Sequence, residues 1–469
     1  MSLFGTAGIR GDAAAEVTPS LALSVGRAAA VDGAEFVVGR DGRGTGPALA
    51  AAVEAGLTSG GADVVRVGRV PTPALAFAAR GRRGVMVTAS HNPPSDNGLK
   101  LFVDGTEYDR DAERAVADRV DGVGAVDPDR WGTVTRAAVL DDYRDAVVDY
   151  ARRRVGGCEG LTVAVDCGNG VAGLATPQVL RALGADVRAL EANVDGHFPG
   201  RESKPTPESL AALRSFVADG DVDLGIGHDG DADRTVVVDA DGEVVHEDTV
   251  LAILAEFYTR ASDADDPVVV TTPNASARVD ERVDAASGRV ERVRLGALHE
   301  GIADARTGGG DGTDVVFAGE PWKHVHTAFG PWIDGVAGAA VVSALVARDG
   351  LSALRDPVTE RPYRKASVEC PDDHKERVMA LLRERLPAEF PGAGVDTKYG
   401  VRLTLDGGAW TLVRPSGTEP YVRAYAESEA VDRLVSEVVA VVERAVEDAA
   451  GVADAADAAN AVDADDTGE

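Results

Sequence analysis

The same short pattern recurs three times along the chain, about a domain's length apart. In each copy a buried-type strand is followed by a loop rich in Gly, Asn or Ser, a helical stretch that ends at glycine, and a second strand. Strands joined through a helix pack side by side as a parallel sheet. We therefore expect three related α/β domains with mixed, largely parallel sheets. The first strands of the three copies are Glu35–Gly39, Leu161–Val165 and Pro267–Thr271.

The last part of the chain departs from this repeat. From residue 361 onward, strand patterns alternate with two helical stretches, which predicts a smaller C-terminal α+β domain. Beyond Gly451 the Ala/Asp-rich sequence has neither bulk nor periodicity and is typical of a disordered acidic tail. The expected domains, arranged around a central cleft, are residues 1–150, 151–250, 251–360 and 361–450, followed by the tail 451–469.

The formal net charge of −30 bears on habitat and partners. Lysine occurs only at positions 100, 204, 323, 365, 375 and 398, and arginine carries the other positive charges. Such a chain is typical of a halophilic cytosol, where salt screens self-repulsion, and its surface would repel nucleic acid. The three scattered cysteines predict no disulfide framework. With no signal segment and no apolar run long enough for a membrane, we expect a cytoplasmic monomer or homodimer.

A serine lies on a stiff loop at the end of an expected strand. Val85–Val87 are apolar, and the following Thr88–Asn92 run into two prolines that prevent a helix from starting. Ser90 is the candidate nucleophile, with His91 beside it, and Lys100 brings a cation back toward the same place. Taken alone, the segment is equally compatible with an ordinary turn, because Ser, Asn and Pro are turn residues.

Three aspartates recur at a period of two in Asp229–Arg234. In an extended segment this spacing aims Asp229, Asp231 and Asp233 to one side. Converging carboxylates repel each other unless a cation joins them, and hard oxygen ligands suit Mg²⁺. An acidic surface turn is the alternative, but the aspartates follow the buried-looking strand Leu224–His228, where such a cluster is costly.

Further polar loops offer sites for a phosphosugar. Gly5–Gly11 places Arg10 in a glycine-rich loop, where backbone amides approach an anion closely. Gly319–His324 follows an apolar strand and presents Glu320 and His324. Near the C-terminus, Arg414–Pro420 offers an arginine, two hydroxyls and loop amides to a phosphate dianion, with Arg423 close by in sequence.

Two other classes of function compete with an enzyme that uses Ser90. Gly168–Gly173 is a full G-x-G-x-x-G after a strand, with Glu191 some distance on, as in an NAD-dependent oxidoreductase. That interpretation leaves Ser90, the aspartates and the C-terminal loop without a role, and we prefer a plain strand-to-helix turn. A non-catalytic phosphosugar-binding protein would share the Arg414 loop but would have no use for Ser90 beside three aspartates.

Together these segments resemble the α-D-phosphohexomutases, the family of phosphoglucomutase, phosphomannomutase and phosphoglucosamine mutase. The likeness runs in family order from Phe4 to Arg423, and its most specific motifs are Thr88–Pro93 and Arg414–Pro420. A segment that resembles a linker of the family lies at His197–Arg201 with Pro205–Glu208.

The resemblance implies a mutase that exchanges a phosphate between positions 1 and 6 of a hexose or amino-hexose, through a phosphoserine at Ser90 and a bound bisphosphate. It implies Mg²⁺ on Ser90 and the three aspartates, and Arg10, Lys100 and His324 as the catalytic groups beside the phosphoryl. The general base is left open between Lys100 and His324. The implied substrate-binding residues are His91, Arg234, Glu320, Arg414, Ser416, Gly417, Thr418 and Arg423.

One loop departs from the family pattern. Where the family usually has Gly-Glu-x-Ser-Gly-His, Trp322 and Lys323 replace the serine and the glycine. His228 also stands where an apolar residue is common. The phosphoryl chemistry does not depend on these positions, so the expected effect is on the sugar, with Trp322 as an apolar wall of the pocket.

Overall fold

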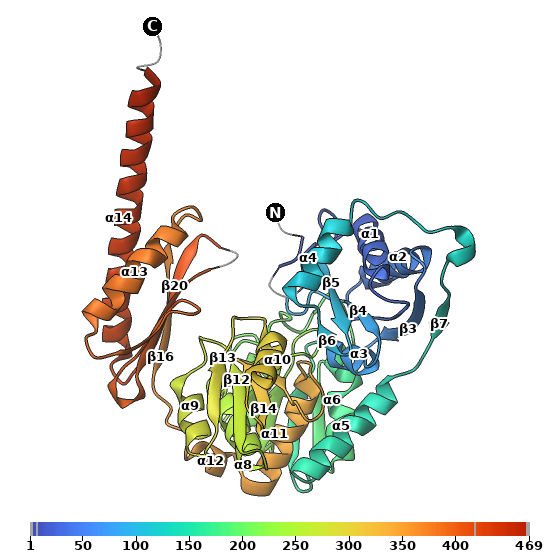
Figure 1. The fold of residues 1–469 in the computed structure, drawn as a ribbon. Helices are drawn as coiled ribbons and strands as arrows, with labels where there is room; N and C mark the ends of the chain where they lie inside the picture. Colours follow the sequence, from blue (N-terminus) through green and yellow to red (C-terminus); the bar gives the residue numbers. More distant parts are fainter. Residues whose placement is uncertain (1–2, 6–7, 417–418, 466–469) are drawn as a thin grey trace. The chain divides into compact units, whose positions relative to one another are not determined.

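The computed structural model describes residues 3–5, 8–416 and 419–465, with residues 451–465 as backbone only. The described chain divides into two compact units, whose helices and strands are drawn in Figure 1. The first unit comprises residues to 271, 282–291 and 295–358, and the second comprises 272–281, 292–294 and 359 onward.

The first sheet is seven-stranded, with the order β1-β5-β4-β2-β3-β7 and β6 on β5. Its centre is parallel, while β5 and β1 join it antiparallel. Helices α1 and α2 lie side by side against it (Figure 1) and bury a core of Val, Leu and Ala side chains. The strands are β1 (Ile9–Asp12), β2 (Glu35–Arg40), β3 (Asp63–Arg69), β4 (Arg83–Val87), β5 (Asp96–Val103), β6 (Thr106–Glu107) and β7 (Val134–Arg136); the helices are α1 (Pro19–Ala30), α2 (Gly46–Ser59), α3 (Thr72–Ala78) and α4 (Arg110–Arg119).

The second and third sheets have four strands each, in the orders β11-β10-β8-β9 and β13-β12-β14-β15. Strand β8 pairs parallel with both neighbours and β12 pairs parallel with β14, whereas β11 and β15 pair antiparallel. The strands are β8 (Thr162–Asp166), β9 (Asp186–Leu190), β10 (Leu224–Gly227), β11 (Val236–Val238), β12 (Asp266–Thr271), β13 (Arg289–Arg292), β14 (Thr313–Glu320) and β15 (Lys323–Val325). The helices are α5 (Leu140–Arg154), α6 (Thr176–Ala182), α7 (Ala211–Ala218), α8 (Glu247–Arg260), α9 (Ala277–Asp284), α10 (Leu298–Gly308), α11 (Gly335–Asp349) and α12 (Leu351–Arg355).

The second unit is built on an antiparallel sheet in the order β16-β20-β19-β18-β17. Helices α13 and α14 pack against each other and against the sheet, burying Leu382, Val401 and Val438 among other apolar side chains. Arg402 ties this sheet to residues 272–281 of the same unit, because its Nη1 donates to Pro273 O at 2.6 Å. The elements are β16 (Tyr363–Glu369), α13 (Lys375–Glu389), β17 (Gly394–Asp396), β18 (Val401–Thr404), β19 (Trp410–Pro415), β20 (Tyr421–Glu427) and α14 (Val431–Asp465).

The predicted fold class is confirmed: three α/β sheets, largely parallel, and a smaller α+β part at the C-terminal end. Helix α14 continues over residues 451–465, the first part of the stretch for which the sequence predicted a disordered tail. Alanine has the highest intrinsic helix propensity, so an Ala-rich stretch prolongs an existing helix at low cost. Residues 466–469 lie outside the described part of the chain.

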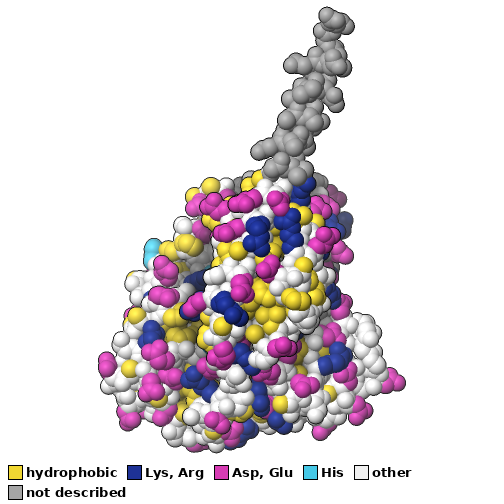
Figure 2. All heavy atoms as spheres, turned by 90° about the vertical axis from the view of Figure 1, so that its left-hand side faces the viewer, with side chains coloured by type: hydrophobic (Ala, Val, Ile, Leu, Met, Phe, Trp, Pro, Cys, Tyr) yellow, Lys and Arg dark blue, Asp and Glu magenta, His cyan; other side chains and the backbone are white. Residues whose placement is uncertain are grey.

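Acidic side chains are spread over the coloured part of the face shown in Figure 2, with lysines and arginines interspersed among them. Many arginines of the described chain form ion pairs, such as Arg289 with Asp266 at 2.7 Å. No helix in the described part of the chain is long and apolar enough to cross a membrane.

Candidate active site

Ser90 follows β4 with its backbone in the left-handed region, at φ 52°. A non-glycine residue is rarely stable there and needs support from its surroundings. Thr88 Oγ1 accepts the Ser90 N–H at 2.9 Å, and Arg43 Nη2 donates to Ser90 O at 2.9 Å. The Ser90 side chain is fully buried, and its Oγ donates to Asp229 Oδ2 at 2.8 Å. The candidate nucleophile is therefore in direct contact with the aspartate loop.

Arg43 holds the serine loop in place, although sequence reasoning missed it. The side chain is fully buried, and its Nε pairs with Asp41 Oδ2 at 3.1 Å. Asp41 in turn accepts a hydrogen bond from Thr88 at 2.7 Å. The sequence could have indicated Arg43, because the polar run Asp41–Thr45 follows a buried strand, as Ser90 does. The carbonyl oxygens that accept from the Arg43 guanidinium are those of Ser90, Asn92, Pro93 and Asp96.

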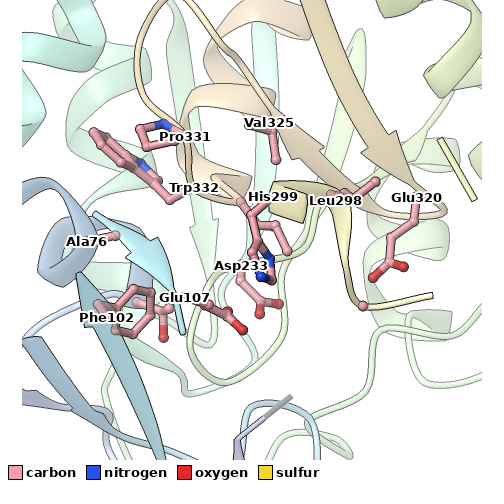
Figure 3. Close-up of a pocket in the computed structure, with 13 residues that line it drawn as sticks. Ala76, Phe102, Glu107, Asp233, Leu298, His299, Glu320, Val325, Pro331 and Trp332 are labelled. Atoms are coloured by element: carbon pink, nitrogen blue, oxygen red, sulfur yellow. The ribbon is translucent and has the colours of Figure 1, made fainter. Parts of the chain in front are cut away.

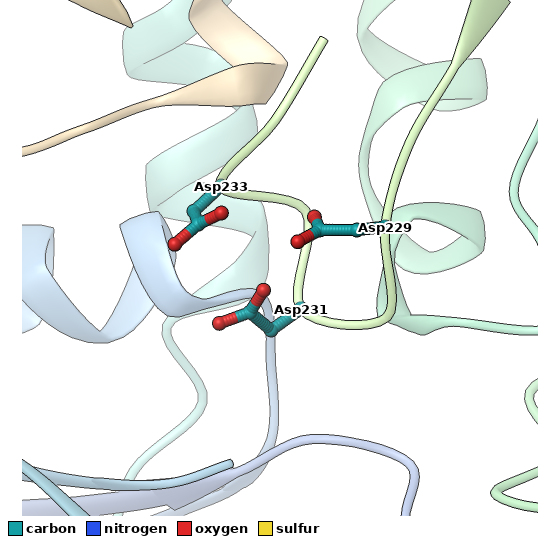
Figure 4. Close-up of side chains that lie close together, drawn as sticks. All are labelled: Asp229, Asp231 and Asp233. Carbon is teal, nitrogen blue, oxygen red and sulfur yellow. The ribbon is translucent and has the colours of Figure 1, made fainter. Parts of the chain in front are cut away.

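The three aspartates converge as expected (Figure 4), with ligand oxygens that all lie within 4.8 Å of one another. They do so on a turn after β10 rather than on an extended strand, because Ala232 adopts φ 61°. All three are buried, and among the described residues Asp231 Oδ1 and Asp233 Oδ1 have no hydrogen-bond partner. Burial and the two neighbouring carboxylates raise the pKa of Asp229 well above its usual value. Buried, unpaired carboxylate oxygens fit a hard divalent cation.

Lys100 is the counter-charge of this cluster. Its buried Nζ lies 3.0 Å from Asp233 Oδ2, 3.8 Å from Asp231 Oδ2 and 3.4 Å from Glu107 Oε1. Burial alone lowers the pKa of Lys100, but Glu107 and the two aspartates outweigh it and raise that pKa above its usual value. The protonated form of Lys100 is therefore favoured in this arrangement. Glu107, on the two-residue strand β6, had no sequence signal.

His91 and Arg234 meet on the other side of Ser90. Arg234 Nη2 donates to His91 Nδ1 at 2.8 Å, and Arg234 Nε lies 3.6 Å from Asp229 Oδ2. Burial, together with the charges of Arg234 and Arg10, lowers the pKa of His91 to about 2, so the imidazole is neutral. Arg10 lies on β1, opposite Gly98 of β5. The structure thus brings His91, Arg234 and Arg10 to the serine and aspartate loops.

The loop between β14 and β15 presents Lys323 rather than His324 to this site. Residues paired across a hairpin share a face, so Glu320 lies with Lys323, while His324 points to the opposite face with Gly319. His324 is buried beside Phe317 and His326, with ring centroids 6.0 and 6.4 Å away. Burial lowers its pKa to about 4, and within the described structure neither of its ring nitrogens has a hydrogen-bond partner. His324 is therefore directed away from the face that carries Glu320.

Trp322 ties this loop to the aspartate loop. Its carbonyl accepts the Thr235 N–H at 2.9 Å, and the Arg234 guanidinium lies 5.9 Å from its ring centroid. The indole packs against the core of the second sheet, which includes Val236 and Val238. Trp322 is not one of the residues that line the neighbouring pocket. Its role as an apolar wall of that pocket therefore has no support from the packing.

A pocket lies beside the aspartate loop (Figure 3). Asp233 belongs to the aspartate loop and also lines the pocket. The other ionisable residues that line the pocket are Glu107, Glu320 and His299. His299 was missed by sequence reasoning; its Nε2 is buried and, within the described residues, has no hydrogen-bond partner. The remaining lining is Thr72, Ala76, Phe102, Gly296, Leu298, Val325, Pro331, Trp332 and Ile333. An acidic floor with aromatic and aliphatic walls suits the two faces of a sugar ring.

In the second unit, Arg414 and Arg423 face each other across β19 and β20. Arg423 pairs with Glu419, and Arg414 Nη2 donates to the Tyr425 hydroxyl at 2.8 Å. A phosphate dianion would add a partner that both arginines share. Both Nε atoms are buried without a hydrogen-bond partner in the described structure. Ser416 is buried, and Lys375 Nζ donates to its carbonyl at 2.7 Å. The predicted residues Gly417 and Thr418 lie outside the described residues.

The glycine loop at Gly168–Gly173 has no amides free for a pyrophosphate at its start. The N–H groups of residues 168–171 donate to Asp166, Glu191, Cys167 and Gly230 at 2.8–3.1 Å. A Cβ on Gly170 would lie 2.8 Å from Gly230 O, so this glycine allows the loop to pack against the aspartate turn. The loop therefore packs against the aspartate turn. Because its first amides are already paired, the glycine pattern no longer supports an NAD-dependent oxidoreductase.

Comparison with known proteins agrees with the fold. The chain matches models of phosphoglucomutase/phosphomannomutase: α/β/α domain I over residues 1–125, α/β/α domain II over 141–242 and the C-terminal domain over 368–445. It is 40% identical over 462 residues to a phosphopentomutase of Thermococcus kodakarensis, covering 96% of this chain and 99% of that protein. A probable phosphoglucosamine mutase of Methanopyrus kandleri is 41% identical over 462 residues, with coverage of 95% and 98%.

A phosphoglucomutase/phosphomannomutase family protein from Burkholderia thailandensis has a similar crystal structure, with a TM-score of 0.81, 27% identity and coverage of 95% and 97%. Fold and site together define an enzyme of the intramolecular phosphotransferase class. The chain belongs to the phosphoglucomutase/phosphomannomutase family of the α-D-phosphohexomutase superfamily. The resemblance noted from its motifs is thereby confirmed.

Proposed function

We propose that the protein is a phosphosugar mutase that moves a phosphate between positions 1 and 6 of a hexose or amino-hexose, with Ser90 as the phosphate carrier. The observation that carries this proposal is the buried Ser90 Oγ, 2.8 Å from Asp229 Oδ2 in a cluster of three carboxylates. A serine carrier replaces one long-range transfer by two in-line transfers. The names of the relatives, a phosphopentomutase and a probable phosphoglucosamine mutase, leave several sugars as candidates.

In the first transfer the bond between phosphorus and Ser90 Oγ breaks and a bond from phosphorus to a sugar hydroxyl oxygen forms, giving a bisphosphate, while the proton of that hydroxyl ends on Ser90 Oγ. In the second transfer the other phosphate of the reoriented bisphosphate moves to Ser90 Oγ, and the proton of Ser90 goes to the sugar oxygen that the phosphate leaves. Asp229, Asp231, Asp233 and the phosphorylated Ser90 would hold Mg²⁺, which when bound offsets negative charge on the phosphoryl oxygens. Lys100, which stays protonated, supplies further positive charge to the same oxygens.

The C-terminal loop would bind the phosphate that is not reacting. Arg414 and Arg423 recognise a dianion and have no feature specific to one sugar carbon, so either end of the bisphosphate would fit. The proposed socket is completed by Ser416, Gly417 and Thr418. A clamp of this kind keeps the bisphosphate from escaping while it turns.

The test uses Ser90→Ala, with Ser95→Ala as the control, because Ser95 is an exposed serine five positions further along the same loop. Ser90→Ala is expected to bind sugar phosphates and to lose isomerisation, while Ser95→Ala keeps both. Mass spectrometry after incubation with glucose 1,6-bisphosphate is expected to place one phosphoryl group on Ser90 of the wild type. Isomerisation by Ser90→Ala at a near wild-type rate would show that the serine is not the carrier.

A further inference from the structure

Lys323 is an ammonium at the sugar-facing loop that nothing in the family pattern anticipates. It lies opposite Glu320 in the β14–β15 hairpin, and its Nζ is 3.3 Å from Glu320 Oε1. Both side chains are largely buried, with 12% and 14% of their surface exposed. A pair at this depth is screened far less by salt than a surface pair.

Lys323 is not itself among the residues that line the pocket, but its charge acts on a carboxyl group that is. It lowers the pKa of Glu107, second only to Lys100 among the neighbouring charges. Lysine is scarce in this chain, yet two of its lysines stand among these buried carboxylates.

The carboxylates that line the described pocket already lie beside two ammonium groups, one of which is shared by Glu107 and Asp233. Glu107 and Asp233 lie 3.4 and 3.0 Å from Lys100, and Glu320 lies 3.3 Å from Lys323. Asp233 also belongs to the cluster that would hold a divalent cation. A further positive charge on the substrate would compete with Lys323 for Glu320 and would be repelled by both lysines.

We propose that Lys323 is a specificity-determining residue that selects sugar phosphates with uncharged ring substituents and disfavours amino sugars, whose ammonium would compete with Lys323 for Glu320. The proposal rests on the proposed function and narrows its substrate class. It predicts that the enzyme prefers phosphates of glucose, mannose or N-acylated sugars to those of glucosamine. Size plays no part in this discrimination, which depends on charge alone.

The experiment compares glucose 6-phosphate with glucosamine 6-phosphate in the wild type and in Lys323→Met, which keeps side-chain length and removes the charge. We expect the wild type to prefer glucose 6-phosphate in kcat/KM. Lys323→Met should shift the ratio toward glucosamine 6-phosphate by about tenfold, the effect of one close charge at about 1.4 kcal/mol per factor of ten. N-acetylglucosamine 6-phosphate, larger but uncharged at the same carbon, should show no such shift relative to glucose 6-phosphate.

Two controls separate charge from structural damage. Lys398→Met, at an exposed lysine, should leave every ratio unchanged. In the wild type the preference should weaken as pH rises through the pKa of the sugar amine itself, which a purely structural role of Lys323 would not produce.

The dissociation constants of the two sugar phosphates, measured by calorimetry, test the selection independently of turnover, so an absence of mutase activity would count against the proposed function alone. Ratios unchanged by Lys323→Met, or a wild-type preference for glucosamine 6-phosphate, would overturn the proposal.

Discussion

Replacing Arg43 by methionine is expected to destabilise the protein and to inactivate it together. The change removes the donors to four carbonyl oxygens of the serine loop and leaves Asp41 buried without its partner. Breaking one side of a buried ion pair costs about 3–5 kcal/mol. The loop also loses the support for the left-handed φ of Ser90, so turnover should fall by more than the loss of folded protein explains.

The loss of stability in Arg43→Met should depend on pH because of Asp41. Burial raises its pKa from 3.8 to about 6, even though Arg43 works in the opposite direction. A carboxyl with a raised folded-state pKa favours the folded state when it is protonated, below the unfolded pKa, and this contribution is lost as pH rises through the folded pKa. Without Arg43 the pKa of Asp41 rises further. The destabilisation by Arg43→Met should therefore be larger at pH 8 than at pH 4 by at least about 1 kcal/mol, the equivalent of roughly one pKa unit.

The assay is the urea midpoint of the first unfolding transition at both pH values, with kcat measured on the folded fraction. Arg153→Met is the control, because the Arg153 side chain is 72% exposed and its partner Asp149 is 3.8 Å away. Asp41→Asn combined with Arg43→Met removes the orphaned charge and should lose less than the sum of the single changes. A loss below about 1 kcal/mol for Arg43→Met, with wild-type turnover, would refute the role assigned to this side chain.

Three further predictions concern the metal, the phosphate and the thiols. Asp231→Asn should weaken Mg²⁺ binding and lower kcat in parallel, and full activity of the wild type in excess EDTA would contradict the metal site. Arg414→Gln should raise KM for sugar phosphates more than Ser416→Ala does, by at least about twofold, because a charged hydrogen bond contributes about 1.5–3 kcal/mol against about 1 for a neutral one. Equal effects in steady-state kinetics would argue against a phosphate socket. Burial raises the pKa of Cys158 and Cys167 to about 12, so both should resist thiol reagents at pH 8 until the protein is denatured, and rapid labelling of the native protein would show that they are accessible.

The sequence by itself determined the fold class and the loops that carry the chemistry. Apolar runs ended by glycine recur three times, and since hydrophobic periodicity and turn chemistry are local properties, strands such as β2, β8 and β12 could be predicted nearly to the residue. Asp229 was found because an acidic cluster is costly directly after a buried strand, and Ser90 because two prolines hold its loop stiff at the end of a strand. The convergence of the aspartates was also expected, although a turn at Ala232 produces it rather than an extended strand.

Only the tertiary structure decided which distant side chains meet. Arg43 and Asp41 reach the serine loop because β2 pairs with β4, and a strand order of this kind cannot be derived from local pattern. The register of the β14–β15 hairpin turns Lys323 toward Glu320 and His324 away, since a shift of one residue reverses the face of every side chain. The charges that keep Lys100 protonated come from segments far apart in the chain, and their balance depends on burial and distance, which composition does not encode.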